Sequence, residues 1–118
     1  MYQQHQTGHD GEHLATNYLK EKGYNILDTN FFVRWGEIDI IAQKNNTIYF
    51  FEVKTRKTLR YGHPFHAISR RKIQKIKGVA SVYLSRHSLS YQALAVGVIG
   101  IIMLPNKPVT IECLPQVI

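Results

Sequence analysis

Apolar residues recur at helical spacing in two segments of the chain. Leu14, Tyr18 and Leu19 fall on one helical face and are followed by Gly23, so we predict a helix over residues 8–22. A second helix is predicted over residues 67–85 from a matching apolar face, which consists of Ile68, Ile73, Ile76, Ala80 and Leu84.

Segments rich in Ile, Val, Tyr and Phe predict strands between and after these helices. Lys44, Asn45 and Asn46 separate two of the segments and predict a tight hairpin turn, because Asn tolerates a left-handed backbone. The predicted strands are residues 24–31, 35–43, 47–55, 91–104 and 109–114.

The resulting order is helix, three strands, helix, two strands. It predicts an α/β fold with a central mixed β-sheet flanked by helices. The length of 118 residues suits one domain, and we expect the polar residues 1–7 to be flexible.

Carboxylates gather on the predicted hairpin. With Asn45 and Asn46 as a two-residue loop, Asp39 falls opposite Glu52, and Glu37 falls opposite Lys54. Alternation then places the charged side chains of Glu37, Asp39, Glu52, Lys54 and Arg56 on one face of the hairpin. The other face is predicted to carry Ile38, Ile40, Tyr49, Phe51 and Val53.

Two facing carboxylates on paired strands repel each other at a separation of ~5 Å. Placed among strands this apolar, they raise each other's pKa or require a cation. Their hard oxygen ligands suit Mg²⁺ or Mn²⁺, which can polarise a phosphate and activate water. Lys54 projects to the same side as Glu52 and could stabilise charge on phosphorus or position the attacking water. The alternative is a cross-strand Glu37–Lys54 ion pair, with Asp39 and Glu52 exposed at the end of a sheet.

The charge balance favours a polyanionic partner. Fifteen Lys and Arg residues against eight Asp and Glu give a net charge of +7, which suits nucleic acid or an anionic membrane surface. The basic cluster of the second predicted helix could neutralise phosphates or could be a solvated face. Its members include Arg70, Arg71, Lys72 and Lys75.

Other features of the composition narrow the setting. A single cysteine, Cys113, excludes an internal disulfide and a cysteine-based zinc cluster, so we expect a reducing, cytoplasmic location. The longest apolar stretch, Leu94 to Leu104, is eleven residues long, against the ~20 of a membrane helix. We therefore expect no membrane partner.

Several blocks resemble one family of small bacterial proteins. They include Gly11-Glu12, Gly36-Glu37-Ile38-Asp39, and the run from Phe51 to Arg56 that reads FEVKTR, together with Asn30 and Lys72. Across residues 8–84 the chain resembles the YraN family, which is similar to the restriction-endonuclease-like superfamily with its PD-(D/E)xK motif and to archaeal Holliday-junction resolvases.

The resemblance implies a restriction-endonuclease-like fold and a metal-dependent nuclease, acting on the phosphodiester bonds of DNA that is branched or under repair. It implies that Asp39 and Glu52 bind the metal, that Lys54 is the catalytic lysine, and that Glu12 reaches the metal from the first helix. Glu37 would be a supporting residue. Arg56 and Lys72 would contact DNA phosphates, and, because junction resolvases of this kind work as pairs, a homodimer is the assembly to test.

Two alternatives remain beside the nuclease. The first is a nucleic-acid-binding module with an inactive nuclease fold, and the second is a protein-interaction domain whose positive charge is incidental. The segment Tyr91-Gln92-Ala93 stands where the resemblance predicts a charged Arg-Phe-Asp-like segment, which favours an altered enzyme.

Overall fold

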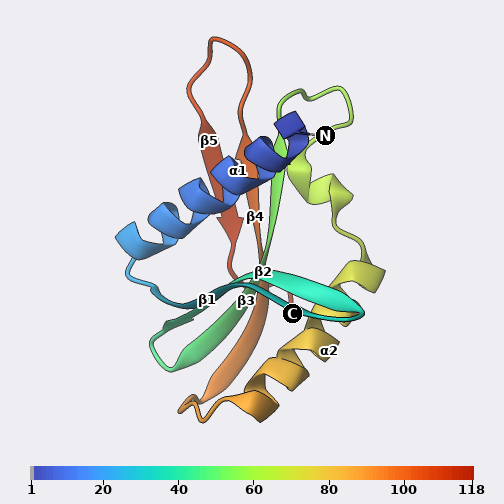
Figure 1. Cartoon of the computed structure of the whole chain (residues 1–118). Coiled ribbons are helices and arrows are strands. Elements are labelled where there is room, and N and C mark those ends of the chain that lie inside the picture. Colours follow the sequence, from blue (N-terminus) through green and yellow to red (C-terminus); the bar gives the residue numbers. More distant parts are fainter. Residues whose placement is uncertain (1) are drawn as a thin grey trace.

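A computed structural model describes the backbone of residues 2–118 and the side chains of residues 10–118 (Figure 1). The elements follow the predicted order α-β-β-β-α-β-β, with one short 3-10 helix added. They are α1 (Tyr2–Glu21), β1 (Asn25–Val33), β2 (Gly36–Lys44), β3 (Thr47–Arg56), η1 (Pro64–Ala67), α2 (Arg70–Arg86), β4 (Ala93–Ile102) and β5 (Thr110–Leu114).

The predicted mixed sheet is confirmed. Its strands lie in the order β1-β2-β3-β4-β5, and only the β3–β4 pair is parallel. The parallel pair requires a crossover, which α2 provides. The predicted turn is also confirmed, because Asn45 and Asn46 have left-handed φ angles of 51° and 67° and Lys44 pairs with Thr47.

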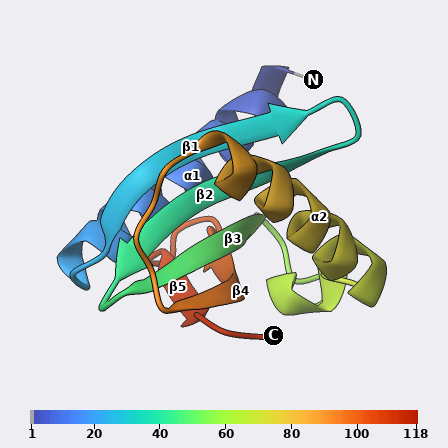
Figure 2. The ribbon, with the colours of Figure 1, turned by 90° about the horizontal axis from the view of Figure 1, so that it is seen from below.

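The two helices cover opposite faces of the sheet and so create two cores (Figure 2). Ala15 and Leu19 of α1 pack on one face against Ile40, Phe51 and their neighbours. The buried residues of α2 pack on the other face against Ile38, Ile41, Ile48, Phe50 and Val96; they are Ile76, Val79, Ala80 and Tyr83. Because each face of the sheet is covered by a helix, the central strands are buried on both faces, and this explains why they are apolar on both faces.

Both predicted helix starts were wrong. Helix α1 begins at Tyr2 rather than at residue 8, because no proline interrupts the polar segment. We expected residues 1–7 to be flexible. Met1 and the side chains of residues 1–9 lie outside the described residues, so this stays a prediction.

Helix α2 begins at Arg70 rather than at residue 67, because Ser69 is its N-cap. The Ser69 hydroxyl accepts a hydrogen bond from the Lys72 N–H at 3.1 Å. In the part of the chain that the structure describes, no helix has the length and hydropathy to cross a membrane.

Candidate active site

The sheet divides at its centre. Strands β2 and β3 pair from the turn as far as Ile40 and Phe51. Beyond that point β2 remains paired with β1 as far as Gly36, and β3 remains paired with β4 as far as Arg56. In Figure 1 the β1–β2 hairpin turns to the right while β3 and β4 continue to the top of the view. Asp39 and Glu52 are the first residues of β2 and β3 after the division.

The predicted register of the hairpin is therefore confirmed near the turn, but the predicted ladder pairs Asp39–Glu52 and Glu37–Lys54 do not form. The backbone of β2 diverges before it reaches them. This divergence opens room between the strands for side chains, and the carboxylate of Asp39 occupies part of it.

The β1–β2 hairpin also changes face at this position. Ile40 packs in the α1 core, whereas Ile38 packs in the α2 core, so the prediction that they share one face was wrong. The change occurs between the pairs Thr29–Ile40 and Phe31–Ile38, where Asn30 has a left-handed φ of 54°. Asn is one of the few residues that adopt this conformation at low cost. The twist at Asn30 thereby turns the adjoining part of β2, including Asp39, out of the regular pleat.

Asp39 bridges the diverging strands with its side chain. Its Oδ2 atom accepts a hydrogen bond from the backbone N–H of Val53 at 2.8 Å, in place of a ladder bond. Its carboxyl group also lies close enough to that of Glu52 for each to alter the pKa of the other. The predicted convergence of Asp39 and Glu52 is therefore present, although it arises from a split sheet rather than from a regular hairpin.

Both carboxyl groups resist ionisation. Burial, then the negative charge of Asp39, raises the pKa of Glu52 to about 7. Burial also raises the pKa of Asp39, against the opposing effect of the Val53 hydrogen bond. Near neutral pH the pair therefore keeps a proton more readily than two exposed carboxyl groups would.

Lys72 of α2 is the cation nearest to this pair among the described ion pairs. Its Nζ atom lies 3.7 Å from Glu52 Oε2, and its charge lowers the pKa of both carboxyl groups. The sequence analysis expected Lys72 to contact DNA phosphates, which stays a prediction, and it did not expect the contact with Glu52. The signal for that contact is that Lys72 directly precedes Ile73, at the border of the apolar helix face. A residue at that border points toward the sheet edge rather than toward solvent.

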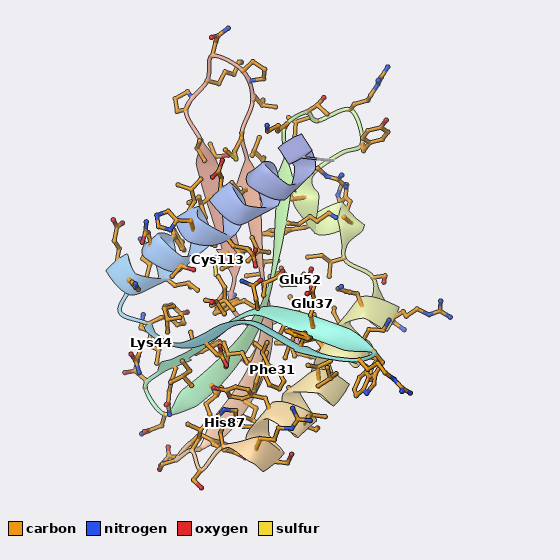
Figure 3. The ribbon with its side chains drawn as sticks, viewed as in Figure 1. Phe31, Glu37, Lys44, Glu52, His87 and Cys113 are labelled. Atoms are coloured by element: carbon orange, nitrogen blue, oxygen red, sulfur yellow. The ribbon has the colours of Figure 1, made fainter. Side chains whose placement is uncertain are left out.

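Glu37 lies beside the pair without being part of it. Its side chain is exposed, and its charge raises the pKa of both Asp39 and Glu52. In Figure 3 it projects from the hairpin toward Glu52. No ion pair joins Glu37 to Lys54 among the described side chains, and Asp39 and Glu52 are not exposed, so neither part of the alternative interpretation of these carboxylates is present.

Lys54 and Arg56 follow Glu52 on β3. The ladder with β4 pairs Lys54 with Gly100 and Arg56 with Ile102 without interruption, so these two side chains share the face of Glu52. Lys54 is half-buried. The Nε atom of Arg56 is buried without a hydrogen-bond partner in the described structure, which leaves it available to an anion.

Glu12 lies on α1, on the other side of the sheet from Lys72. It follows Gly11, which packs directly against the Thr55 side chain of β3. Among the described residues, no group of three or more His, Cys, Asp or Glu side chains is arranged to hold a metal ion. The structure thus brings Asp39 and Glu52 together but does not add Glu12 to them as a third ligand.

The remaining predicted phosphate contacts lie at the start of α2. Arg70, Arg71 and Lys75 are exposed, and the Lys75 side chain runs beside Gly36, where an added Cβ would lie 3.1 Å from its Cγ atom. Of these cations, Lys75 therefore lies beside the β1–β2 hairpin, whereas Lys72 lies beside Glu52.

Comparison with known proteins identifies relatives along most of the chain. The profile of Uncharacterised protein family UPF0102 matches residues 11–104. A UPF0102 protein of Syntrophomonas wolfei is 40% identical over 97 residues, which cover 82% of this chain and 84% of the relative. A UPF0102 protein of Clostridioides difficile is 40% identical over 100 residues, 85% of this chain and 88% of the relative. One of Alkaliphilus oremlandii is 53% identical over 74 residues, 63% of each chain.

Proposed function

The chain belongs to the uncharacterised protein family UPF0102, and from its buried acidic pair we propose that it is a metal-dependent nuclease that hydrolyses phosphodiester bonds of DNA. The observation that carries the proposal is the contact between the carboxyl groups of Asp39 and Glu52, at the point where β2 leaves β3. The resemblance to restriction-endonuclease-like enzymes and junction resolvases supports the same chemistry.

The acidic pair fits a divalent cation. Two half-buried carboxyl groups that keep a proton near neutral pH are destabilised as anions, and a cation would remove that cost. Asp39 and Glu52 would hold Mg²⁺ or Mn²⁺, whose preferred ligands are carboxylate oxygens. When bound, such an ion supplies a positive charge that polarises phosphate and lowers the pKa of water.

The side chains around the pair would have separate roles in metal binding, charge stabilisation and DNA binding. Glu52 must lose its proton before its oxygens can serve as ligands, and the ammonium group of Lys72 favours that loss. Lys54, on the same face of β3, would stabilise the negative charge that develops on the attacked phosphate. Arg56, Arg70, Arg71 and Lys75 would hold the neighbouring phosphates, with a salt dependence proportional to the contacts made.

A DNA-cleavage assay tests the proposal. The wild-type protein should cleave at least one of duplex, single-stranded, forked or four-way DNA in Mg²⁺ or Mn²⁺, and not in EDTA. Asp39→Asn, Glu52→Gln and Lys54→Ala should each reduce the rate by about a hundredfold or more. Glu21→Gln and Lys107→Ala are matched controls, because both residues are exposed and lie away from the acidic pair.

Metal binding supplies a second readout that does not depend on cleavage. Mn²⁺ should raise the thermal unfolding temperature of the wild type and of Glu21→Gln, but not of Asp39→Asn. Cleavage that survives in Asp39→Asn and Glu52→Gln would identify a contaminating enzyme and contradict the proposal.

The second candidate is a nucleic-acid-binding module without activity. The exposed cations Arg70, Arg71 and Lys75 at the start of α2 favour it, since they would hold DNA whether or not it is cut. In that case binding would fall steeply with salt and would not change when the metal is removed.

A further inference from the structure

Phe32 is a large apolar side chain left in solvent beside the acidic pair. It is 72% exposed, more than any other large hydrophobic residue of the part that the structure describes. It belongs to β1 and pairs across the strands with Glu37. Exposing a phenyl ring costs roughly 1.5–3 kcal/mol relative to burial, so its position calls for an explanation.

The direction of Phe32 follows from its neighbours. Phe31 packs against Tyr83 in the α2 core, with ring centroids 4.9 Å apart, and its strand partner Ile38 lies in the same core. Because side chains alternate along a strand, Phe32 and Glu37 project from the opposite side of the hairpin. Figure 3 shows Phe31 and Glu37 on opposite sides of the ribbon, with Glu37 directed toward Glu52. Phe32 is therefore separated from the acidic pair by one side chain, that of Glu37.

The hairpin that carries Phe32 is held firmly. The Trp35 ring lies against Gly78 of α2, where an added Cβ would come within 3.0 Å of it, and Gly36 approaches Val79 equally closely. The ring of Phe32 is thus presented on a fixed support, which reduces the entropy lost when a ligand binds to it.

The positive charges around the hairpin favour a negatively charged ligand. Arg34 is exposed at its turn, Lys75 lies beside Gly36 on the side that α2 covers, and Lys72 pairs with Glu52. The hairpin thus presents an exposed ring on one face and cations at its turn and along its other face, next to carboxylates that would hold a metal, and this combination complements a polyanion with flat apolar groups. A nucleic acid has both parts, since its phosphates meet the cations and its bases have π faces.

We propose that Phe32 stacks on an unpaired nucleobase adjacent to the phosphodiester bond at Asp39 and Glu52. This deepens the proposed function, on which it rests, because it defines the substrate as DNA with unstacked bases: single strands, flaps or fork points. In a continuous duplex the bases are stacked on one another and offer no free face to Phe32.

Binding measured without cleavage tests this proposal. Labelled single-stranded, forked and fully paired DNA are titrated with the protein in Ca²⁺, in the Glu52→Gln background. Phe32→Ala should weaken binding of the single-stranded and forked DNA by about tenfold, the equivalent of one lost stacking contact, and leave duplex binding unchanged. Phe32→Tyr should restore it. Tyr91→Ala is the matched control, since Tyr91 is 40% exposed near the β2–β3 turn, at the far end of β3.

A direct spectroscopic readout comes from Phe32→Trp. Stacking should quench its fluorescence on addition of an oligonucleotide, relative to the wild type, in which Trp35 is the only tryptophan. Equal loss of binding to paired and unpaired DNA, or no quenching, would overturn the proposal. So would a change of oligomeric state in Phe32→Ala without DNA, because that would make the ring a contact between two copies of the chain.

The nuclease proposal and the stacking proposal can be contradicted by different results. Cleavage that depends on Asp39 but is unaffected by Phe32→Ala would leave the nuclease and remove the stacking role. Loss of binding in Phe32→Ala, in a protein that cuts no DNA, would keep the stacking role and contradict the nuclease.

Discussion

Lys72 Nζ lies 3.7 Å from Glu52 Oε2, where α2 approaches the part of β3 that β2 has left. The Glu52 side chain is 13% exposed and that of Lys72 is 38% exposed, so solvent screens this contact only in part. The ion pair links α2, which carries more exposed cations than any other helix or strand, to the acidic pair that would hold a metal. It also provides a positive charge where two carboxyl groups would otherwise face each other alone.

Lys72→Met should raise the pKa of Glu52 further above its ordinary range. The ammonium group stabilises the charged carboxylate, and methionine keeps the length of the side chain without the charge. A carbon-13 NMR titration of the metal-free protein measures the effect directly. Lys77→Met, at an exposed position of the same helix, should leave the Glu52 titration unchanged. An unchanged Glu52 pKa in Lys72→Met would show that the two side chains do not interact in solution.

The pKa of Glu52 should make the stability of the metal-free protein depend on pH. Its folded pKa, about 7, lies above its ordinary value of 4.5, so the folded state keeps a proton that the unfolded state releases. The penalty is absent below about pH 4.5, grows as the pH rises toward 7, and is constant above that.

Denaturant unfolding of the wild type and Glu52→Gln between pH 4.5 and 8 isolates this contribution. The variant should gain stability relative to the wild type as the pH rises, and added Mn²⁺ should reduce the difference by stabilising only the wild type. Parallel pH profiles would contradict the raised pKa.

The parts of the site that could be predicted from the sequence follow from local rules. The hairpin turn at Asn45-Asn46 fixed the register as far as Ile40 and Phe51, and the order of the elements fixed the fold class. The divergence of β2 from β3 could not be predicted, because it depends on how the β1–β2 hairpin packs on α2. The contact of Lys72 with Glu52 was not predicted for the same reason. The distance from Lys72 to Glu52 depends on the rotation of α2 about its axis. The sequence indicates that rotation only roughly, through the border between the apolar and polar faces of the helix.

The contact of Gly11 with Thr55 sets how closely α1 approaches β3. In an ordinary helix interior, Gly→Ala stabilises by roughly 0.5–1 kcal/mol. At Gly11 an added Cβ would overlap the Thr55 hydroxyl, so Gly11→Ala should lower the free energy of unfolding by about 1–3 kcal/mol. The double variant Gly11→Ala/Thr55→Ala should recover most of that loss. A double-mutant cycle by urea unfolding measures the coupling, and independent, additive effects would contradict the close approach.

Asn30 is the position at which the β1–β2 hairpin changes face. Its backbone has a left-handed φ of 54°, a conformation that is especially costly for a β-branched residue. Asn30→Val should therefore lower the free energy of unfolding by about 1–3 kcal/mol. Asn30→Gly is the matched control, because glycine adopts this conformation freely and should stay close to the wild type. The twist at Asn30 also brings Asp39 to Val53, so a relaxed strand in Asn30→Val should separate Asp39 from Glu52 and lower the Glu52 pKa toward 4.5. Urea unfolding and the carbon-13 titration of Glu52 measure the two effects on the same samples. Equal stability of the Val and Gly variants, with the Glu52 titration unchanged in both, would show that the face change does not depend on the backbone of Asn30.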